Sequence, residues 1–310
     1  MDPFDLASVF SLRRLLGEVT DRDVPVMRTV APVERARSVA LLPGSFNPPT
    51  VAHVHLAERA LLDGIERVVF TYARTTVGKS QSGLIPEDRL LLMRAASVQG
   101  TGVAAVSHGL YADQAEAAGA LFPGASIYFL VGSDKVIQIF QHHWYPDRDE
   151  ALERLFSRAV LIAAPRSDQG EQLTSVLRAS ENKRWADRVD IVRLHPAIGE
   201  LSSTRVRGLL RAGAEPAGLV PSAAAPLLSS MGAFAPPMLA GSEEIDAYTL
   251  RARLIDVLWE MYGPATPAVD LRALCAIAVS QSEHGKRFRS MLGDDSFTQH
   301  DLLRAQEARA

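Results

Sequence analysis

The central part of the chain alternates between two patterns of apolar residues. Short, unbroken apolar runs that end at turn residues predict buried strands. Strands are expected over 38–42, 66–72, 103–107, 126–131, 159–164 and 189–194. Apolar residues at helical spacing predict helices over 49–62, 86–98, 113–121, 149–156 and 203–212. This alternation predicts an α/β fold: a doubly wound, mostly parallel sheet with helices on both faces, whose ligands bind beyond the carboxyl ends of the strands.

The N-terminal region has a simpler pattern. Apolar residues at helical spacing predict a helix over 4–18, with Asp2 before Pro3 as its cap and entry. Residues 21–37 are polar and interrupted by prolines, so we expect a linker there. We therefore treat residues 1–37 as an N-terminal helix and linker that precede a central domain over 38–235.

The C-terminal region, 236–310, is expected to be a helical extension with helices over 243–262, 271–290 and 298–308. The apolar face of the first helix must be buried, because a lone amphipathic helix of this length is only marginally stable in water. We expect the extension to pack on the central domain or on a second subunit. The alternative is a basic lid over the bound ligand, built from Arg251, Arg253, Lys286, Arg287 and Arg289.

Composition excludes several classes of protein. Hydrophobic residues make up 47% and charged residues 22%, which is typical of a globular protein. The single cysteine, Cys275, excludes an intrachain disulfide and favours a reducing, cytoplasmic location. Apolar runs are too short for a membrane span, and Asp2 and Asp5 lie where a signal peptide would be positive. A net charge of -3 argues against a nucleic-acid polymer as partner but leaves room for a local phosphate pocket.

The first motif that carries chemistry is Gly-Ser-Phe-Asn-Pro-Pro-Thr-Val-Ala-His, residues 44–53. It lies where the first predicted strand turns into the first helix. Gly44 lets the backbone approach a ligand closely, and the amides of Ser45 and Phe46 can point at phosphate oxygens. His53 lies about one turn into the helix, within reach of the same phosphates.

Two further motifs follow other predicted strands. Leu-Ser-Ser-Thr-Arg-Val-Arg, residues 201–207, places Ser203 and Thr204 at a helix start, where free amides bind anions, and adds Arg207 as a phosphate clamp. Taken alone, it is more often an ordinary capped helix. Gly132-Ser133-Asp134 ends the most apolar strand, where an aspartate can accept hydrogen bonds from ribose hydroxyls. Taken alone, it is equally well a turn that caps the next helix.

Motifs of competing enzyme classes are missing from the sequence. It contains no Gly-x-x-x-x-Gly-Lys-Ser/Thr of a P-loop kinase, no Gly-x-Gly-x-x-Gly of a dinucleotide-binding dehydrogenase and no Gly-x-Ser-x-Gly elbow of a hydrolase.

The three motifs together resemble the nicotinamide- and nicotinate-mononucleotide adenylyltransferases of the nucleotidyltransferase superfamily. The resemblance covers about residues 38–234. It implies a Rossmann-like nucleotidyltransferase fold, with His53 and Arg207 as catalytic residues that stabilise the triphosphate. Thr50 stands where many bacterial members have a first histidine, and Ala52 where the family often has glycine.

The resemblance also implies how the substrates are divided between residues. ATP would contact Gly44, Ser45, Phe46, Thr50, His53, Gly132, Asp134, Ser203, Thr204 and Arg207. The mononucleotide would contact Ser45, Phe46, Lys79, Trp144 and Arg166, with Lys79 on the phosphate and Trp144 stacked on the pyridine ring.

The implied reaction is adenylyl transfer from ATP to nicotinamide mononucleotide (or nicotinate mononucleotide), which gives NAD or its deamido form and pyrophosphate. Mg2+ would be held mainly by substrate phosphates, and no protein metal ligand is expected. The alternatives are a sibling transferase, either a phosphopantetheine adenylyltransferase or a CTP-using cytidylyltransferase, and a non-catalytic nucleotide sensor. A homo-oligomer is possible, and the choice between amide and acid is left open.

Overall fold

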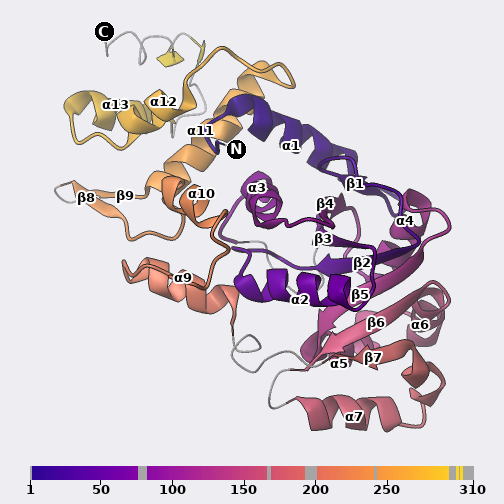
Figure 1. Cartoon of the computed structure of the whole chain (residues 1–310). Coiled ribbons are helices and arrows are strands. Elements are labelled where there is room, and N and C mark those ends of the chain that lie inside the picture. The colour runs from indigo at the N-terminus through magenta and orange to yellow at the C-terminus, as the bar shows by residue number, and fades with distance from the viewer. Residues whose placement is uncertain are drawn as a thin grey trace.

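The computed structural model describes residues 2–75, 82–165, 169–192, 201–240, 243–292, 298–299 and 301–302 (Figure 1). Its centre is a seven-stranded sheet with the order β1-β4-β3-β2-β5-β6-β7. Neighbouring strands are parallel except for β1 and β4. The predicted fold class is confirmed. The strands are β1 (Met27–Thr29), β2 (Ser38–Pro43), β3 (Arg67–Ala73), β4 (Thr101–Val106), β5 (Ser126–Gly132), β6 (Ala159–Ala164) and β7 (Val189–Ile191).

Helices and short 3-10 turns connect the strands and continue beyond them. They are α1 (Leu6–Glu18), α2 (Val51–Leu62), α3 (Pro86–Ala96), α4 (Tyr111–Leu121), α5 (Ser133–Ile139), η1 (His142–Trp144), α6 (Arg148–Phe156), α7 (Gly170–Arg178), η2 (Lys183–Arg188), α9 (Ser203–Arg211), α10 (Ala225–Ser230), α11 (Ala247–Tyr262), α12 (Leu271–Ala278) and α13 (Glu283–Leu292). A small hairpin, β8 (Met238–Ala240) and β9 (Glu243–Ile245), precedes α11. None of the described helices combines the length and apolar character of a membrane span.

Both faces of the sheet are buried, which explains the unbroken apolar runs in its strands. Along β2, Ala40 and Leu42 belong to one core together with residues of α2 and α3. Val39 and Leu41 belong to a second core with residues of α4, α5 and α6. Alternate side chains of a strand point to opposite faces, so the central strands β2 to β6 contribute to both cores.

Residues 21–37 were predicted to be a linker, but they contain a short edge strand, β1. Its three residues run antiparallel to β4, with Met27 opposite Val106 and 2% exposed. A strand this short gives little periodicity, and Pro25 and Pro32 lie outside it, where they do not interrupt its pairing. The helix predicted over 4–18 begins at Leu6, because Asp5 rather than Asp2 caps it by accepting from Ala7 and Ser8 amides.

The C-terminal helices are also divided differently from the prediction. The first residues of the predicted 243–262 helix form β9, and α11 starts after Asp246, whose side chain accepts from the Thr249 amide. The predicted 271–290 helix is two helices, α12 and α13, separated by a turn around Ser280–Ser282. Most of 298–308 lies outside the described residues. Helix α7 was not predicted, and α5 begins where the alternative interpretation of residues 132–134 expected a turn that caps a helix.

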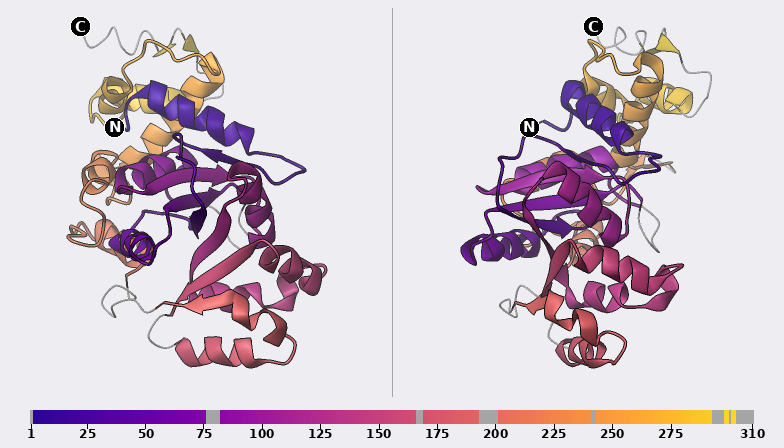
Figure 2. Two further views of the ribbon diagram at one scale, coloured as in Figure 1. Left: turned by 45° about the vertical axis from the view of Figure 1, so that its right-hand side comes forward. Right: turned by 90° about the vertical axis from the view of Figure 1, so that its right-hand side faces the viewer.

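The N-terminal helix and the C-terminal region lie together at one end of the molecule (Figures 1 and 2). Phe10 of α1 meets Trp259 of α11 edge to face, with ring centroids 5.0 Å apart. Arg13 of α1 donates to Asp256 of α11 over 2.8 Å. Both ends of the chain thus pack on each other beside α3.

Candidate active site

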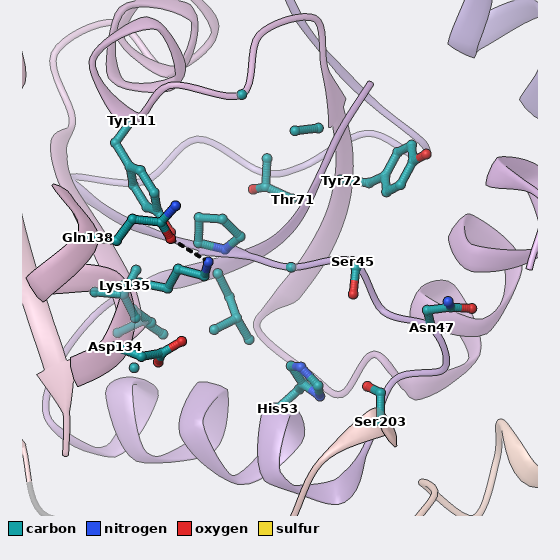
Figure 3. Close-up of a pocket in the computed structure, with 18 of the residues that line it drawn as sticks. Ser45, Asn47, His53, Thr71, Tyr72, Tyr111, Asp134, Lys135, Gln138 and Ser203 are labelled. Atoms are coloured by element: carbon teal, nitrogen blue, oxygen red, sulfur yellow. Dashed lines mark hydrogen bonds between the residues drawn. The ribbon is translucent and has the colours of Figure 1, made fainter. Parts of the chain in front are cut away.

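A cleft of about 580 Å3 opens at the carboxyl ends of β2, β3, β5 and β6. The chain crosses from one side of β2 to the other at this point, because β3 and β5 flank β2 on opposite sides. Such a switch point is the usual ligand site of an open α/β sheet. The cleft also falls in the size range of small-molecule sites, about 300–1,000 Å3. In Figure 3, Ser45, His53 and Ser203 face it from one side and Asp134, Lys135 and Tyr111 from the other.

The 44–53 loop follows β2 and forms one wall of the cleft. A side chain at Gly44 would place its Cβ 3.0 Å from the Phe46 ring, so a larger residue there would crowd the buried ring. Phe46 has a φ of 44° and is fully buried, with its ring 5.8 Å from the Phe70 ring. The Phe46 side chain therefore belongs to the core, and only its backbone can meet a ligand.

His53 lies in the first turn of α2, and its orientation is fixed by Thr50. The Thr50 amide donates to His53 Nδ1 over 3.0 Å, and the buried Thr50 hydroxyl lies 2.8 Å from the same atom. Because a backbone N–H can only donate, Nδ1 accepts, and the neutral ring carries its proton on Nε2. Thr50 therefore contacts the imidazole of His53 through Nδ1, and the donor of the ring is Nε2–H.

Helix α9 brings the second motif to the same loop. Arg207 Nη1 donates to the Asn47 carbonyl over 2.8 Å, and Ser203 Oγ donates to the Pro48 carbonyl over 2.7 Å. Arg207 Nη2 also donates to Thr204 Oγ1 over 3.1 Å. The helix cap is Ser202 rather than Ser203 or Thr204. Burial, and then the neighbouring Arg211, lowers the pKa of Arg207.

The third motif lies on the other side of the cleft. Helix α5 begins directly after Gly132, so Asp134 is in its first turn and exposed at the cleft. A Cβ at Gly132 would lie 2.5 Å from Asp134 Oδ1, so glycine leaves room for that carboxylate. Trp144 is half-buried in η1, lines the cleft, and donates from Nε1 to Gln141 Oε1 over 3.1 Å.

Two predicted residues, Lys79 and Arg166, lie outside the described residues. Their described neighbours in sequence, Ser82 and Pro165, line the cleft. The three motifs themselves meet at the cleft, where His53 and Arg207 are among the lining residues.

Several cleft residues had no role in the sequence analysis. Asn47 joins the loop to the segment before α3: its Nδ2 donates to the Ser82 carbonyl over 2.8 Å, and its Oδ1 accepts from the Leu84 amide over 3.0 Å. Arg89, from the first turn of α3, is 3% exposed, and burial lowers its pKa. Arg89 gave no signal because an arginine in a predicted helix is usually solvated.

Two more missed residues, Tyr111 and Lys135, line the cleft beside Asp134. Burial raises the pKa of the Tyr111 hydroxyl, which keeps it protonated. Lys135 Nζ donates to Gln138 Oε1 over 2.7 Å (Figure 3). Among the described residues, no three His, Cys, Asp or Glu side chains gather as a metal site.

The known proteins that are similar to this chain carry the names of nucleotidyltransferases. Residues 41–209 match the family described as cytidylyltransferase-like. The "Probable nicotinate-nucleotide adenylyltransferase" of Geobacter sulfurreducens is 28% identical over 206 residues, which are 59% of this chain and 91% of that protein. The protein of the same description from Gemmatimonas aurantiaca is 28% identical over 204 residues, 63% of this chain and 92% of that protein.

A solved structure, the Plasmodium falciparum nicotinic acid mononucleotide adenylyltransferase complexed with NaAD, is also similar. Its TM-score is 0.48 and its sequence identity 16%, with 64% of this chain and 97% of that chain covered.

Proposed function

This chain belongs to the cytidylyltransferase-like family and is a nucleotidyltransferase, and we propose that it transfers the adenylyl group of ATP to a pyridine mononucleotide. The products are the dinucleotide and pyrophosphate. The observation that carries this proposal is the meeting of two distant motifs: Arg207 donates a hydrogen bond to the carbonyl of Asn47, 160 residues away, in the loop that holds His53. We further propose that residues 38–235 form the transferase domain.

The reaction needs positioning and charge neutralisation rather than a nucleophilic side chain. The phosphate of the mononucleotide attacks the α-phosphorus of ATP in line, and the bond to pyrophosphate breaks. His53 donates from Nε2 to a phosphate oxygen whose charge grows in the transition state. Arg207 neutralises the triphosphate, because its lowered pKa still leaves the guanidinium charged.

The other cleft residues divide between the two substrates. Ser45 and the amides of the loop support phosphates, and Asp134 accepts from ribose hydroxyls. Trp144 offers its indole face to the pyridine ring. Lys79 and Arg166 are proposed on the phosphate and base sides from sequence alone. Thr50 and Ser203 act through the contacts that hold His53 and the loop.

Mg2+ fits this donor set as an ion held by the substrates. Asp134 is the one carboxylate among the described residues that line the cleft. Because Asp134 is proposed on the ribose, Mg2+ would be held mainly by phosphate oxygens and water, and the ion would supply further neutralisation of phosphate charge.

We propose nicotinate mononucleotide as the preferred substrate. Both relatives above are named for the nicotinate form. The choice rests on contacts to one small group on the ring. The proposed product is therefore the deamido form of NAD, with NAD itself as the slower product.

One experiment separates these possibilities. The protein is incubated with Mg2+, either ATP or CTP, and nicotinate mononucleotide, nicotinamide mononucleotide or phosphopantetheine in turn, and products are identified by mass. We expect dinucleotide from ATP and the pyridine mononucleotides, with the acid faster. Product from phosphopantetheine or only from CTP would assign a sibling transferase, and binding without turnover would indicate a nucleotide sensor.

A further inference from the structure

The first turn of α3 buries three consecutive charged residues beside the cleft. Glu87 is 3% exposed, Asp88 0% and Arg89 3%. Burying charged groups costs more than their mutual attraction returns unless their geometry is well matched. Their partners therefore indicate what the turn is built to do.

Asp88 is held by the C-terminal region. Arg251 of α11 donates to both of its carboxylate oxygens, over 2.7 and 3.0 Å, and is 1% exposed. The Tyr248 hydroxyl donates to Asp88 Oδ2 over 2.8 Å and accepts from the Ile85 amide over 2.8 Å. Arg251 also donates to the Pro3 carbonyl, so this cluster joins the two ends of the chain to the start of α3.

Glu87 is held in the same way from α1. Arg13 Nε donates to Glu87 Oε1 over 2.5 Å, while Arg13 Nη2 reaches Asp256 of α11. Both acidic residues lie in the first turn of α3, at the positive end of the helix dipole, where negative side chains interact favourably with the helix.

Arg89, the next residue, points from this turn to the cleft. Its guanidinium donates to the carbonyls of Ser45 over 3.2 Å, Ser82 over 2.9 Å and Leu84 over 2.8 Å. These bonds tie the 44–53 loop to the segment that leads into α3. A displacement of the first turn of α3 would therefore move the support of the loop that holds the phosphates.

A bidentate arginine–carboxylate pair fixes direction as well as distance. Apolar residues of similar volume often match a buried ion pair in stability, so stability alone does not explain this cluster. We propose that Asp88 and Arg251, with Tyr248, are positioning residues of the active site. They hold the first turn of α3 so that Arg89 keeps the 44–53 loop in its binding shape. The C-terminal region thus supports catalysis without touching substrate.

The test compares full-length variants at temperatures where each is folded. Arg251→Lys keeps the charge but loses the fork, and Tyr248→Phe removes only the hydroxyl. Arg272→Met is the matched control: it breaks another C-terminal contact, to Asp2 and the Phe4 ring, without reaching α3. We measure the Kd of a non-hydrolysable ATP analogue and kcat/KM for dinucleotide formation. For Arg251→Lys we expect about a tenfold loss in both, the scale of one charge-assisted hydrogen bond. Tyr248→Phe should lose less, and Arg272→Met should be normal.

A double-variant cycle with Arg89→Lys then separates positioning from packing. If Arg251 acts through Arg89, the double variant should lose little more activity and affinity than Arg89→Lys alone. If the two residues act independently, their separate losses should multiply in the double variant. Multiplying effects would overturn the proposal. Normal kinetics and affinity in folded Arg251→Lys and Tyr248→Phe, or equal losses in Arg272→Met, would also overturn it. The kinetic readout rests on the proposed transfer reaction, whereas the analogue Kd does not, so absence of dinucleotide with wild-type protein refutes only that reaction.

Discussion

The 44–53 loop and the first turn of α3 touch each other but use their polar side chains in opposite ways. Polar side chains of the loop face the cleft. In His53 the ring proton is on Nε2, because Nδ1 accepts from the Thr50 amide. The first turn of α3 buries its charged side chains, and Asp88 accepts hydrogen bonds from residues 160 and 163 positions away. This wall of the cleft thus comes from a short, contiguous motif, while the groups that hold the turn of α3 come from the distant helices α1 and α11.

This contrast predicts that variants of cleft-facing side chains such as His53 change turnover with little loss of stability. The sharpest case is His53→Ala, which removes a donor aimed at developing phosphate charge. We expect kcat to fall by about 100- to 1000-fold, with smaller changes in KM. Steady-state kinetics of dinucleotide formation measure it. His55→Ala is the control, because His55 is exposed on the same helix and its Nδ1 bonds the Val51 carbonyl. Near-normal turnover in folded His53→Ala would remove this residue from the reaction.

The central strands were predictable because both faces of the sheet bury them. Strand β6 has the predicted bounds, and β2 and β5 end one residue later than predicted. Burial on two faces gives a continuous apolar run, whereas β1 has three residues at a sheet edge and leaves no such signal. Helices α12 and α13 share one apolar period across a short turn, so periodicity alone joined them.

In the candidate site, the residues that belong to local sequence motifs were predictable, and those that depend on distant pairings were not. His53 and Arg207 belong to motifs whose residue types bind phosphates wherever a strand ends at a helix. Arg89, Asp88 and Arg251 carry no such local signal, because their roles depend on pairings between distant segments.

The second prediction concerns Arg207, which belongs to both sides of the comparison. It lines the cleft, and it also supports the loop through the Asn47 carbonyl. Arg207→Ala should weaken ATP and pyrophosphate binding by about 10- to 100-fold, the scale of hydrogen bonds to a charged group. Calorimetric titration of a non-hydrolysable ATP analogue checks this. Arg211→Ala, one turn later on α9, should bind normally. An unchanged ATP affinity with weaker mononucleotide binding would place Arg207 on the other substrate.

The smallest effect on activity is expected at Cys275, in the C-terminal region beside Arg251. Burial raises the pKa of its thiol to about 12, above the ordinary value of the unfolded chain. The folded protein therefore favours the protonated thiol, and this contribution to stability is complete below the unfolded pKa and is lost as the pH rises toward 12. Cys275→Ala should leave kcat and KM unchanged, because Cys275 does not line the cleft. Its free energy of unfolding should fall less steeply than that of the wild type between about pH 9 and 11. Denaturant titrations across that range measure the difference. Parallel curves for the two proteins would mean that the thiol is not buried as described, and altered kinetics in the variant would mean that Cys275 influences the cleft through Arg251 beside it.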